Sequence, residues 1–200
     1  MVTIKYITHA CFEISNKKKI LIDPYFKENP TMPTYNGKPD IILITHEHFD
    51  HVDAGGFNSK VIAPSTVNFK NQITMKIGDE KEIDGIKIKM IKASHHQSKN
   101  PTGYVITIDG KKIAHLGDTY IDGVSYLGDI DLLLLPIGGY YTMNINEALK
   151  ALEIIKPKKA IPMHYNTFDE IKADPEIFRR NAVKIGYDVV VLKPQETINL

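Results

Sequence analysis

Short apolar runs of strand length, rather than long helical patterns, dominate the first part of the chain. The runs nearest the start are closely spaced and rich in β-branched residues: Val2–Ile7, Cys11–Ser15 and Lys19–Asp23. Three later runs are almost continuously apolar, which is typical of strands buried on both faces: Ile41–Ile44, Lys60–Ala63 and Asp131–Leu135. Apolar residues alternate in Ile83–Met90, which predicts one further strand. Gly103–Asp109 and Lys112–His115 flank an Asp-Gly pair and predict a hairpin.

Helical patterns are confined to the second half. We predict one helix at Asn146–Ile155, with Asn144 or Asn146 as its N-cap, and another at about Pro175–Ile185, ended by Gly186. Strand-like runs follow these helices: Ala160–Met163, Val189–Leu192 and Thr197–Asn199. We therefore expect an α+β fold, a four-layer αββα sandwich of two mixed β-sheets with helices outside, as a single domain over residues 1–200. Glu28–Lys38 has no periodicity and predicts a loop.

Composition narrows the class of protein. The 200 residues are 42% hydrophobic and 24% charged, as in an ordinary globular domain. Lys and Arg number 25 against 24 Asp and Glu, for a net charge of +1, so nucleic acid is not the expected partner. The single cysteine excludes a disulfide framework, and no apolar stretch reaches the roughly 18 residues of a membrane span. We expect a cytoplasmic protein that acts on a small molecule, and a homo-oligomer is compatible with this sequence.

The eight histidines are not scattered. Directly after the apolar run at Ile41–Ile44 comes the string His46-Glu47-His48-Phe49-Asp50-His51. In an extended or turning backbone, His46 and His48 project to the same side, whereas Asp50 and His51 reach a second position nearby. Imidazole and carboxylate groups suit Zn²⁺, Fe²⁺ or Mn²⁺, so the string predicts a metal site.

This HxHxDH string resembles the metallo-β-lactamase fold superfamily. The likeness extends to three later strand ends, where that superfamily places its remaining ligands: Ala93-Ser94-His95, Gly117-Asp118-Thr119 and Pro162-Met163-His164. Further motifs are similar to its small UPF0173 or UlaG-like branch of metal-dependent hydrolases: Leu21-Ile22-Asp23-Pro24, Leu135-Pro136-Ile137-Gly138, Tyr141-Thr142-Met143 and Pro162–Phe168. One departure is Gly139, where that branch commonly has an acidic residue.

The resemblance implies a ligand set for two divalent ions. His46, His48 and His95 would hold one ion, Asp50, His51 and His164 the other, and Asp118 would bridge them. Zinc is the expected metal, with Mn, Fe or Ni as alternatives. Two ions, two carboxylates and a bridging hydroxide leave about +1 at the site, which favours an anionic substrate group or a developing oxyanion. The implied enzyme is a hydrolase in which that hydroxide, held with Asp50 and Asp118, attacks an ester, lactone or phosphodiester of a small anionic substrate.

Neighbouring residues have open roles. By resemblance, Asp23 orients a ligand histidine, although a plain turn aspartate before Pro24 is the alternative. His9 either reaches the metal site or is a satisfied core histidine. Of the adjacent pair, we assign His95 as the ligand, which leaves His96 to line the pocket, to bind a substrate anion or simply to be exposed. His115 is expected to be structural.

Tyr165 and Asn166 follow the last expected ligand, and either could stabilise an oxyanion with its hydroxyl or amide group. Two other functions use the same fold, namely an RNA or DNA phosphodiesterase and a non-catalytic module that binds metal or ligand. The near-neutral charge disfavours the first. All the expected ligand positions are occupied, which disfavours the non-catalytic module, because a protein that has lost its activity should also have lost some of its ligand residues.

Overall fold

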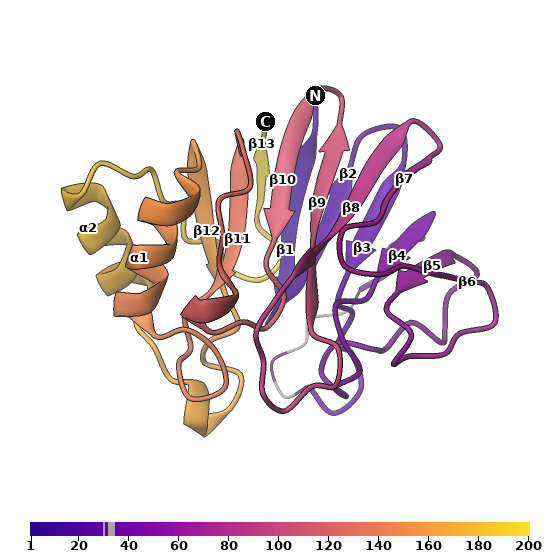
Figure 1. The fold of residues 1–200 in the computed structure, drawn as a ribbon, viewed down its shortest axis with the longest axis horizontal. Helices are drawn as coiled ribbons and strands as arrows, with labels where there is room; N and C mark the ends of the chain where they lie inside the picture. Colours follow the sequence, from indigo (N-terminus) through magenta and orange to yellow (C-terminus); the bar gives the residue numbers. More distant parts are fainter. Residues whose placement is uncertain (30, 32–34) are drawn as a thin grey trace.

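In the computed structural model, which describes residues 1–29, 31 and 35–200, two β-sheets pack face to face (Figure 1). The predicted loop at Glu28–Lys38 includes residues 30 and 32–34, which lie outside the described residues. The predicted α+β sandwich is confirmed.

The first sheet contains seven strands within the described residues. In spatial order they are β13 (Thr197–Asn199), β1 (Thr3–Thr8), β2 (Cys11–Ser15), β3 (Lys19–Ile22), β4 (Ile41–Leu43), β5 (Lys60–Ala63) and β6 (Gln72–Thr74). Neighbours from β13 to β3 are antiparallel, whereas β3, β4, β5 and β6 run parallel. The parallel strands therefore send their carboxyl ends to one edge of the sandwich.

The second sheet contains six strands in the same part of the chain. In order they are β12 (Lys159–Met163), β11 (Leu132–Pro136), β10 (Lys111–His115), β9 (Thr102–Ile108), β8 (Ile86–Lys92) and β7 (Glu80–Ile83). Strands β10, β11 and β12 are parallel, and the others pair antiparallel. The sandwich core lies between the two sheets and consists mainly of aliphatic side chains from both.

The continuous apolar runs are buried on both faces, as their composition predicts. In β11, Leu132 and Leu134 face the sandwich core, whereas Leu133 and Leu135 belong to a separate cluster under the helices. Residues 41–44 alternate in the same way, with Ile41 in the sandwich core and the next residue in a third cluster outside the first sheet. Since side chains alternate along a strand, both faces must be apolar when both are covered.

Within the described residues, both α-helices cover the second sheet. The first, α1 (Ile145–Ile155), begins with a capping box between Asn144 and Glu147, and the second is α2 (Pro175–Lys184), capped by Asp174. Both lie outside β11 and β12 (Figure 1), where buried residues of α1 and α2 share the cluster of Leu133. Two 3₁₀ turns occur at Ile121–Gly123 and Asp169–Ile171. None of the helices in the described part of the chain is both long and apolar enough to cross a membrane.

Four details differ from the sequence-based expectations. In the described residues the outer face of the first sheet is covered by loops instead of a helical layer, with Phe26 and Phe57 among the side chains packed there. The segment at Ile83–Met90 is two strands, because Asp84-Gly85 forms a turn with φ of +53° and +79°. Strand β6 was not predicted. Val189–Leu192 forms only a single bridge, from Val189 to Ala160.

Candidate metal centre

The candidate site lies in the loops at the carboxyl ends of strands from both sheets, at the lower edge of Figure 1. Each expected ligand follows a strand: the histidine string follows β4, and three single residues follow β8, β10 and β12, namely His95, Asp118 and His164. Two further polar residues follow β1 and β3, namely His9 and Asp23. The parallel pairing within each sheet explains why residues so far apart in sequence share one edge.

One group of ring nitrogens comes from His46, His48 and His95. Nε2 of His46 lies 3.1 Å from Nδ1 of His48, and Nε2 of His95 lies 3.2 Å from the same Nδ1. One nitrogen from each of the three residues falls within 4.8 Å of the others. Three imidazole nitrogens that face a common point form a set of ligands suited to a transition-metal ion.

Asp118 lies between this group and a second one, which consists of Asp50, His51 and His164. Its Oδ2 is 3.0 Å from Nε2 of His164 and 3.4 Å from Nε2 of His51. The same oxygen is 3.8 Å from Nε2 of His46 and 3.9 Å from Nε2 of His95. Asp50 adds a second carboxylate, with Oδ1 3.7 Å from Nε2 of His51. Asp118 therefore faces both groups at once.

Several atoms that face this cluster are buried without a hydrogen-bond partner among the described residues. They are Nε2 of His51, Nε2 of His164 and Oδ1 of Asp118. Buried polar atoms normally have a partner, because an unpaired one costs about 1–3 kcal/mol. A divalent cation would engage the two ring nitrogens, and the unpaired Oδ1 belongs to the carboxylate that lies between the two groups, so the residues present fit a bound metal.

The surrounding hydrogen bonds fix the tautomer of four histidines. Nδ1 of His95 donates to the Tyr141 carbonyl at 3.0 Å, and Nε2 of His48 donates to the Gln97 carbonyl at 3.2 Å. The outward nitrogen therefore carries the proton in both rings. The inward nitrogen then keeps its lone pair, which is the form that binds a metal.

Asp23 and Thr45 fix the other two rings. Buried Asp23 accepts hydrogen bonds from the Thr45 amide at 2.8 Å, the Thr45 hydroxyl at 2.7 Å and Nδ1 of His51 at 2.9 Å. Since the Thr45 hydroxyl donates to Asp23, it accepts from Nδ1 of His46 at 2.9 Å. In the neutral form of both rings, Nε2 is then the nitrogen that offers its lone pair toward the cluster.

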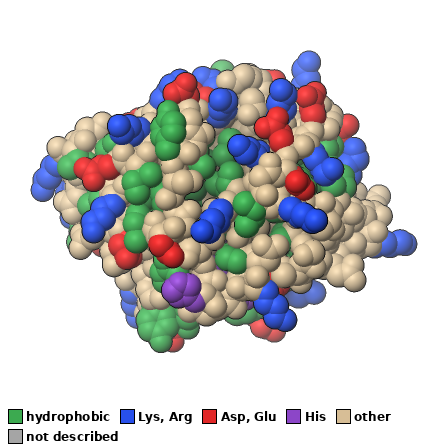
Figure 2. Space-filling view, in the orientation of Figure 1, with side chains coloured by type: hydrophobic (Ala, Val, Ile, Leu, Met, Phe, Trp, Pro, Cys, Tyr) green, Lys and Arg blue, Asp and Glu red, His purple; other side chains and the backbone are tan. Residues whose placement is uncertain are grey.

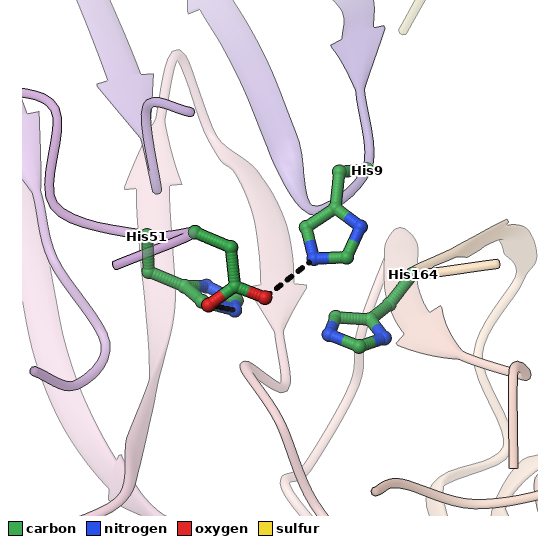
Figure 3. Close-up of side chains that lie close together, drawn as sticks. His9, His51 and His164 are labelled. Atoms are coloured by element: carbon green, nitrogen blue, oxygen red, sulfur yellow. Dashed lines mark hydrogen bonds and ion pairs between the residues drawn. The ribbon is translucent and has the colours of Figure 1, made fainter. Parts of the chain in front are cut away.

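His9 is part of this arrangement. Its Nε2 donates to Oδ2 of Asp50 at 3.2 Å, the contact that is dashed in Figure 3, and its Nδ1 accepts from the Thr167 hydroxyl at 3.0 Å. The ring centroid of His9 is 4.0 Å from that of His164. Burial, together with the charge of His164, lowers the pKa of His9 to about 4, so the ring is neutral at pH 7. His9 thus holds the Asp50 carboxylate in place.

The electrostatics favour ionised carboxylates and a neutral His46 but a protonated His51, because burial, which would lower the pKa of His51, is outweighed by Asp118, Asp50 and Asp23, and they raise this pKa well above its usual value. Burial alone would raise the pKa of Asp118, but the nearby His164 and His51 outweigh it and hold the pKa well below its usual range. Burial also opposes ionisation of Asp50, and His51 and His9 again hold the pKa low. For His46, burial and the neighbouring His51 lower the pKa. Ionised carboxylates thus lie beside a neutral His46.

Some of the site residues have a strained backbone. Three non-glycine site residues have positive φ: His9 at +53°, Asp23 at +44° and His164 at +55°. Such conformations cost energy, and in proteins they cluster at functional sites. The His164 amide donates to the His9 carbonyl at 2.9 Å, which links two of these residues directly.

Some of the residues singled out in the sequence lie away from the cluster. His96 is exposed, and its ring packs 4.9 Å from that of Tyr120. Tyr165 packs against the cluster under the helices, and the amide oxygen of Asn166 accepts from the Ala173 backbone. Neither Tyr165 nor Asn166 lines the pocket described below, because their side chains serve the loop that follows β12. His115 is buried and donates to the Ala10 carbonyl at 2.8 Å, which is a structural role.

Three groups that orient histidines of the site are not identified by the sequence patterns. Thr45 and Thr167 were visible in the sequence as polar neighbours of expected ligands, at −1 from His46 and +3 from His164. The Tyr141 carbonyl leaves no trace in side-chain patterns. It is presented by a turn in which the Tyr141 amide donates to the Gly139 carbonyl, and Gly139 has φ of +70°, a conformation that favours glycine.

A pocket of about 370 Å³ opens over the cluster. Its lining consists of five cluster residues and five others: His48, Asp50, His95, Asp118 and His164, with Phe49, Gln97, Tyr141, Phe168 and Glu170. A second groove of about 440 Å³ lies over β8, β9 and β10 and contains none of the cluster residues. The first pocket is therefore the one at which chemistry by the cluster can occur.

Known proteins resemble this chain over its whole length. The sequence model of the beta-lactamase superfamily domain matches residues 3–164. A UPF0173 metal-dependent hydrolase from Thermoplasma volcanium is 42% identical over 96% of each chain, and one from Pyrococcus horikoshii is 40% identical over 100% of each. The solved structure of a metallo hydrolase from Ignicoccus hospitalis is 32% identical and superposes with a TM-score of 0.87 over 98% of this chain and 97% of that one.

These matches confirm the resemblance that the histidine string and the later strand ends predicted. They cover the loops of every cluster residue, from His9 to His164. The chain belongs to the beta-lactamase superfamily and, within it, to the UPF0173 family of metal-dependent hydrolases.

Proposed function

We propose that this hydrolase uses two divalent metal ions to cleave an ester, lactone or phosphodiester of a small molecule. His46, His48 and His95 would hold one ion, and Asp50, His51 and His164 the other, with Asp118 between them. The observation that carries this proposal is the position of Asp118 Oδ2, which lies within 3.9 Å of ring nitrogens from both groups. Zinc suits this mixture of imidazole and carboxylate, although Mn, Fe and Ni suit it too.

The chemistry supplied by such ions, when bound, is a water of lowered pKa as nucleophile and a positive field for the developing oxyanion. The protein's own contribution is orientation. Thr45, Asp23 and two backbone carbonyls turn the inward nitrogens of four histidines toward the cluster. His9 fixes one oxygen of Asp50 and leaves the other to face His51. With formal charges of +4 and −2 before a nucleophile is counted, the site favours a carbonyl or phosphoryl group that gains negative charge.

The expected partner is a small molecule in the cytoplasm rather than nucleic acid. The net charge of +1 supports this, since binders of the phosphate backbone usually carry a clear basic surplus. The pocket of about 370 Å³ lies within the range of small-ligand sites.

Substitution of Asp118 tests the proposal. Metal-loaded wild-type protein should hydrolyse at least one member of a panel of aryl esters, lactones and bis(aryl) phosphates. Asp118→Ala should lose metal, measured by elemental analysis, and lower turnover more than about 100-fold, because the oxygen shared by both groups is gone. Asp129→Ala removes an exposed aspartate elsewhere and should change neither quantity. Full activity in Asp118→Ala, or no turnover of any panel member by metal-loaded wild type, would contradict it.

A further inference from the structure

We infer that the pocket over the cluster selects a substrate with an aromatic, uncharged body and discriminates against one whose body carries a negative charge. This inference deepens the proposed function and rests on it. It concerns the part of the substrate beyond the scissile group, which meets the pocket walls rather than the cluster.

The walls are largely aromatic. Of the five lining residues that do not belong to the cluster, three are Phe49, Tyr141 and Phe168. The other two are Gln97 and Glu170, and no lysine or arginine lines the pocket within the described part of the chain. Sites that recognise phosphate or carboxylate groups usually provide such cations for hydrogen bonding. This lining is therefore suited to an aromatic ring and not to an anion.

One aromatic wall is firmly supported. The rings of Phe49 and Phe168 are 6.2 Å apart, and each lies near Tyr25, at 5.8 Å and 6.1 Å. Tyr25 is fully buried, and its hydroxyl donates to the Glu28 carbonyl at 3.0 Å. Phe49 nevertheless remains 61% exposed. A large apolar ring that is held from behind and open at the front of a pocket is suited to contact a ligand ring.

A second part of the lining is fixed by hydrogen bonds. The carbonyls of Gln97 and Tyr141 accept from the two histidines His48 and His95, so their backbone positions are tied to the cluster. The side chain of Gln97 donates to the Tyr120 hydroxyl at 3.3 Å. The same contacts that orient the two histidines thus hold Gln97 and Tyr141 beside the cluster.

Glu170 supplies the charge discrimination. It lies in the 3₁₀ turn after β12, is exposed, and has no ion-pair partner among the described residues. Its neighbour Asp169 already engages Lys172 at 2.7 Å. An unpaired carboxylate at the pocket repels a negatively charged substituent and tolerates a neutral or positive one.

The lysines lie elsewhere. The groove over β8, β9 and β10 is lined by four of them, Lys87, Lys89, Lys92 and Lys112. In Figure 2, Lys and Arg side chains are spread across the visible face among acidic ones. Positive charge at the pocket would come from the bound ions alone and would act on the scissile group. The expectation of an anionic substrate group therefore applies to the reacting centre, whereas the walls favour an uncharged aromatic body.

Three matched esters test this inference. They are phenyl acetates that carry a methyl, a carboxylate or a trimethylammonium group at the 4-position, and water cleaves the acyl C–O bond of each to give acetate and the corresponding phenol. For the metal-loaded wild type, kcat/KM should be lowest for the carboxylate ester. Glu170→Gln should raise kcat/KM for that ester about three- to tenfold and leave the methyl ester unchanged. Glu153→Gln makes the same charge change on an exposed part of α1 and should leave kcat/KM unchanged for all three esters.

The aromatic wall is tested with Phe49→Ala, which is suitable because the side chain is already exposed. This variant should raise KM for 4-methylphenyl acetate about three- to tenfold relative to ethyl acetate. Tyr126→Ala removes another exposed aromatic residue away from the pocket and should not. A preference for the carboxylate ester, or equal effects of Phe49→Ala on both esters, would overturn the inference.

A binding measurement separates this inference from the proposed function. Saturation-transfer NMR on metal-free protein compares p-cresol with 4-hydroxybenzoate, neither of which can be hydrolysed. Saturation should reach p-cresol more strongly, and Phe49→Ala should reduce it. If no ester is turned over but this difference is seen, the proposed hydrolysis fails and the pocket inference stands. If esters are turned over and both ligands bind equally in wild type and variant, the pocket inference fails.

Discussion

Asp23→Asn is the most informative single change outside the expected ligands. The Asp23 carboxylate is fully buried and accepts three hydrogen bonds, at 2.7, 2.8 and 2.9 Å. Asparagine has the same shape but keeps one acceptor oxygen. Because the Thr45 backbone amide can only donate, the amide oxygen must face it. The new NH₂ group then meets Nδ1 of His51, which is also a donor.

The conflict has two outcomes, and both weaken metal binding. Either the donors remain opposed, or His51 moves its proton to Nε2, the atom that faces the cluster. Loss of a hydrogen bond to a charged group costs about 1.5–3 kcal/mol. Since about 1.4 kcal/mol is tenfold in an equilibrium constant, we expect metal affinity to fall about 10–100-fold, the range usual for residues that orient ligand histidines.

A zinc titration against a chromophoric chelator measures this effect. Asp131→Asn is the matched control, because Asp131 also accepts a backbone amide, that of Lys112 at 2.8 Å, but lies away from the cluster. Asp131→Asn should bind metal as the wild type does. If Asp23→Asn keeps wild-type affinity, or if both variants lose it equally, the argument from the His51 tautomer is wrong.

Two further predictions concern other histidines. His95→Ala should lower the metal content measured by elemental analysis, whereas His96→Ala should not, because His96 is exposed and packs against Tyr120; equal metal loss in both variants would contradict the geometry. In metal-free protein, burial lowers the pKa of His115, so the unfolded chain takes up this proton first as the pH falls through 6.5. As the pH falls, the free energy of unfolding, measured by urea denaturation, should then decrease by up to about 1.4 kcal/mol per pH unit because of this group. His115→Gln should remove this contribution to the pH dependence. A slope that is the same in the variant would refute it.

Local sequence patterns accounted for most of the strands, because alternation and turn residues are local properties. The Asp109-Gly110 hairpin and the cap at Asn144 are two such cases. Asp84-Gly85 carries the same turn signal, but the apolar alternation runs through it, so two strands were read as one. The helical layer expected on the first sheet belonged to the αββα architecture inferred from the order of strands and helices along the whole chain, whereas short connections with Gly55-Gly56 or Pro64 do not favour helices.

The site was predictable to a different extent. The expected ligands could be predicted because each follows a strand, and parallel strands bring their carboxyl ends to one edge. The contacts of His9 with Asp50 and Thr167 join loops that follow β1, β4 and β12, which are far apart in the chain, so the sequence left its role open. The carbonyls that orient His48 and His95 belong to the backbone, and no residue type identifies them. The pocket walls likewise combine loops that are far apart in the chain.

In the proposed site, one cluster holds two ions around Asp118. Anomalous diffraction from crystals of the zinc-loaded protein, recorded on both sides of the zinc absorption edge, tests it most directly. We expect two peaks in the cluster, one among His46, His48 and His95 and the other among Asp50, His51 and His164, with Asp118 contacting both. A single peak, or peaks at other residues, would contradict it.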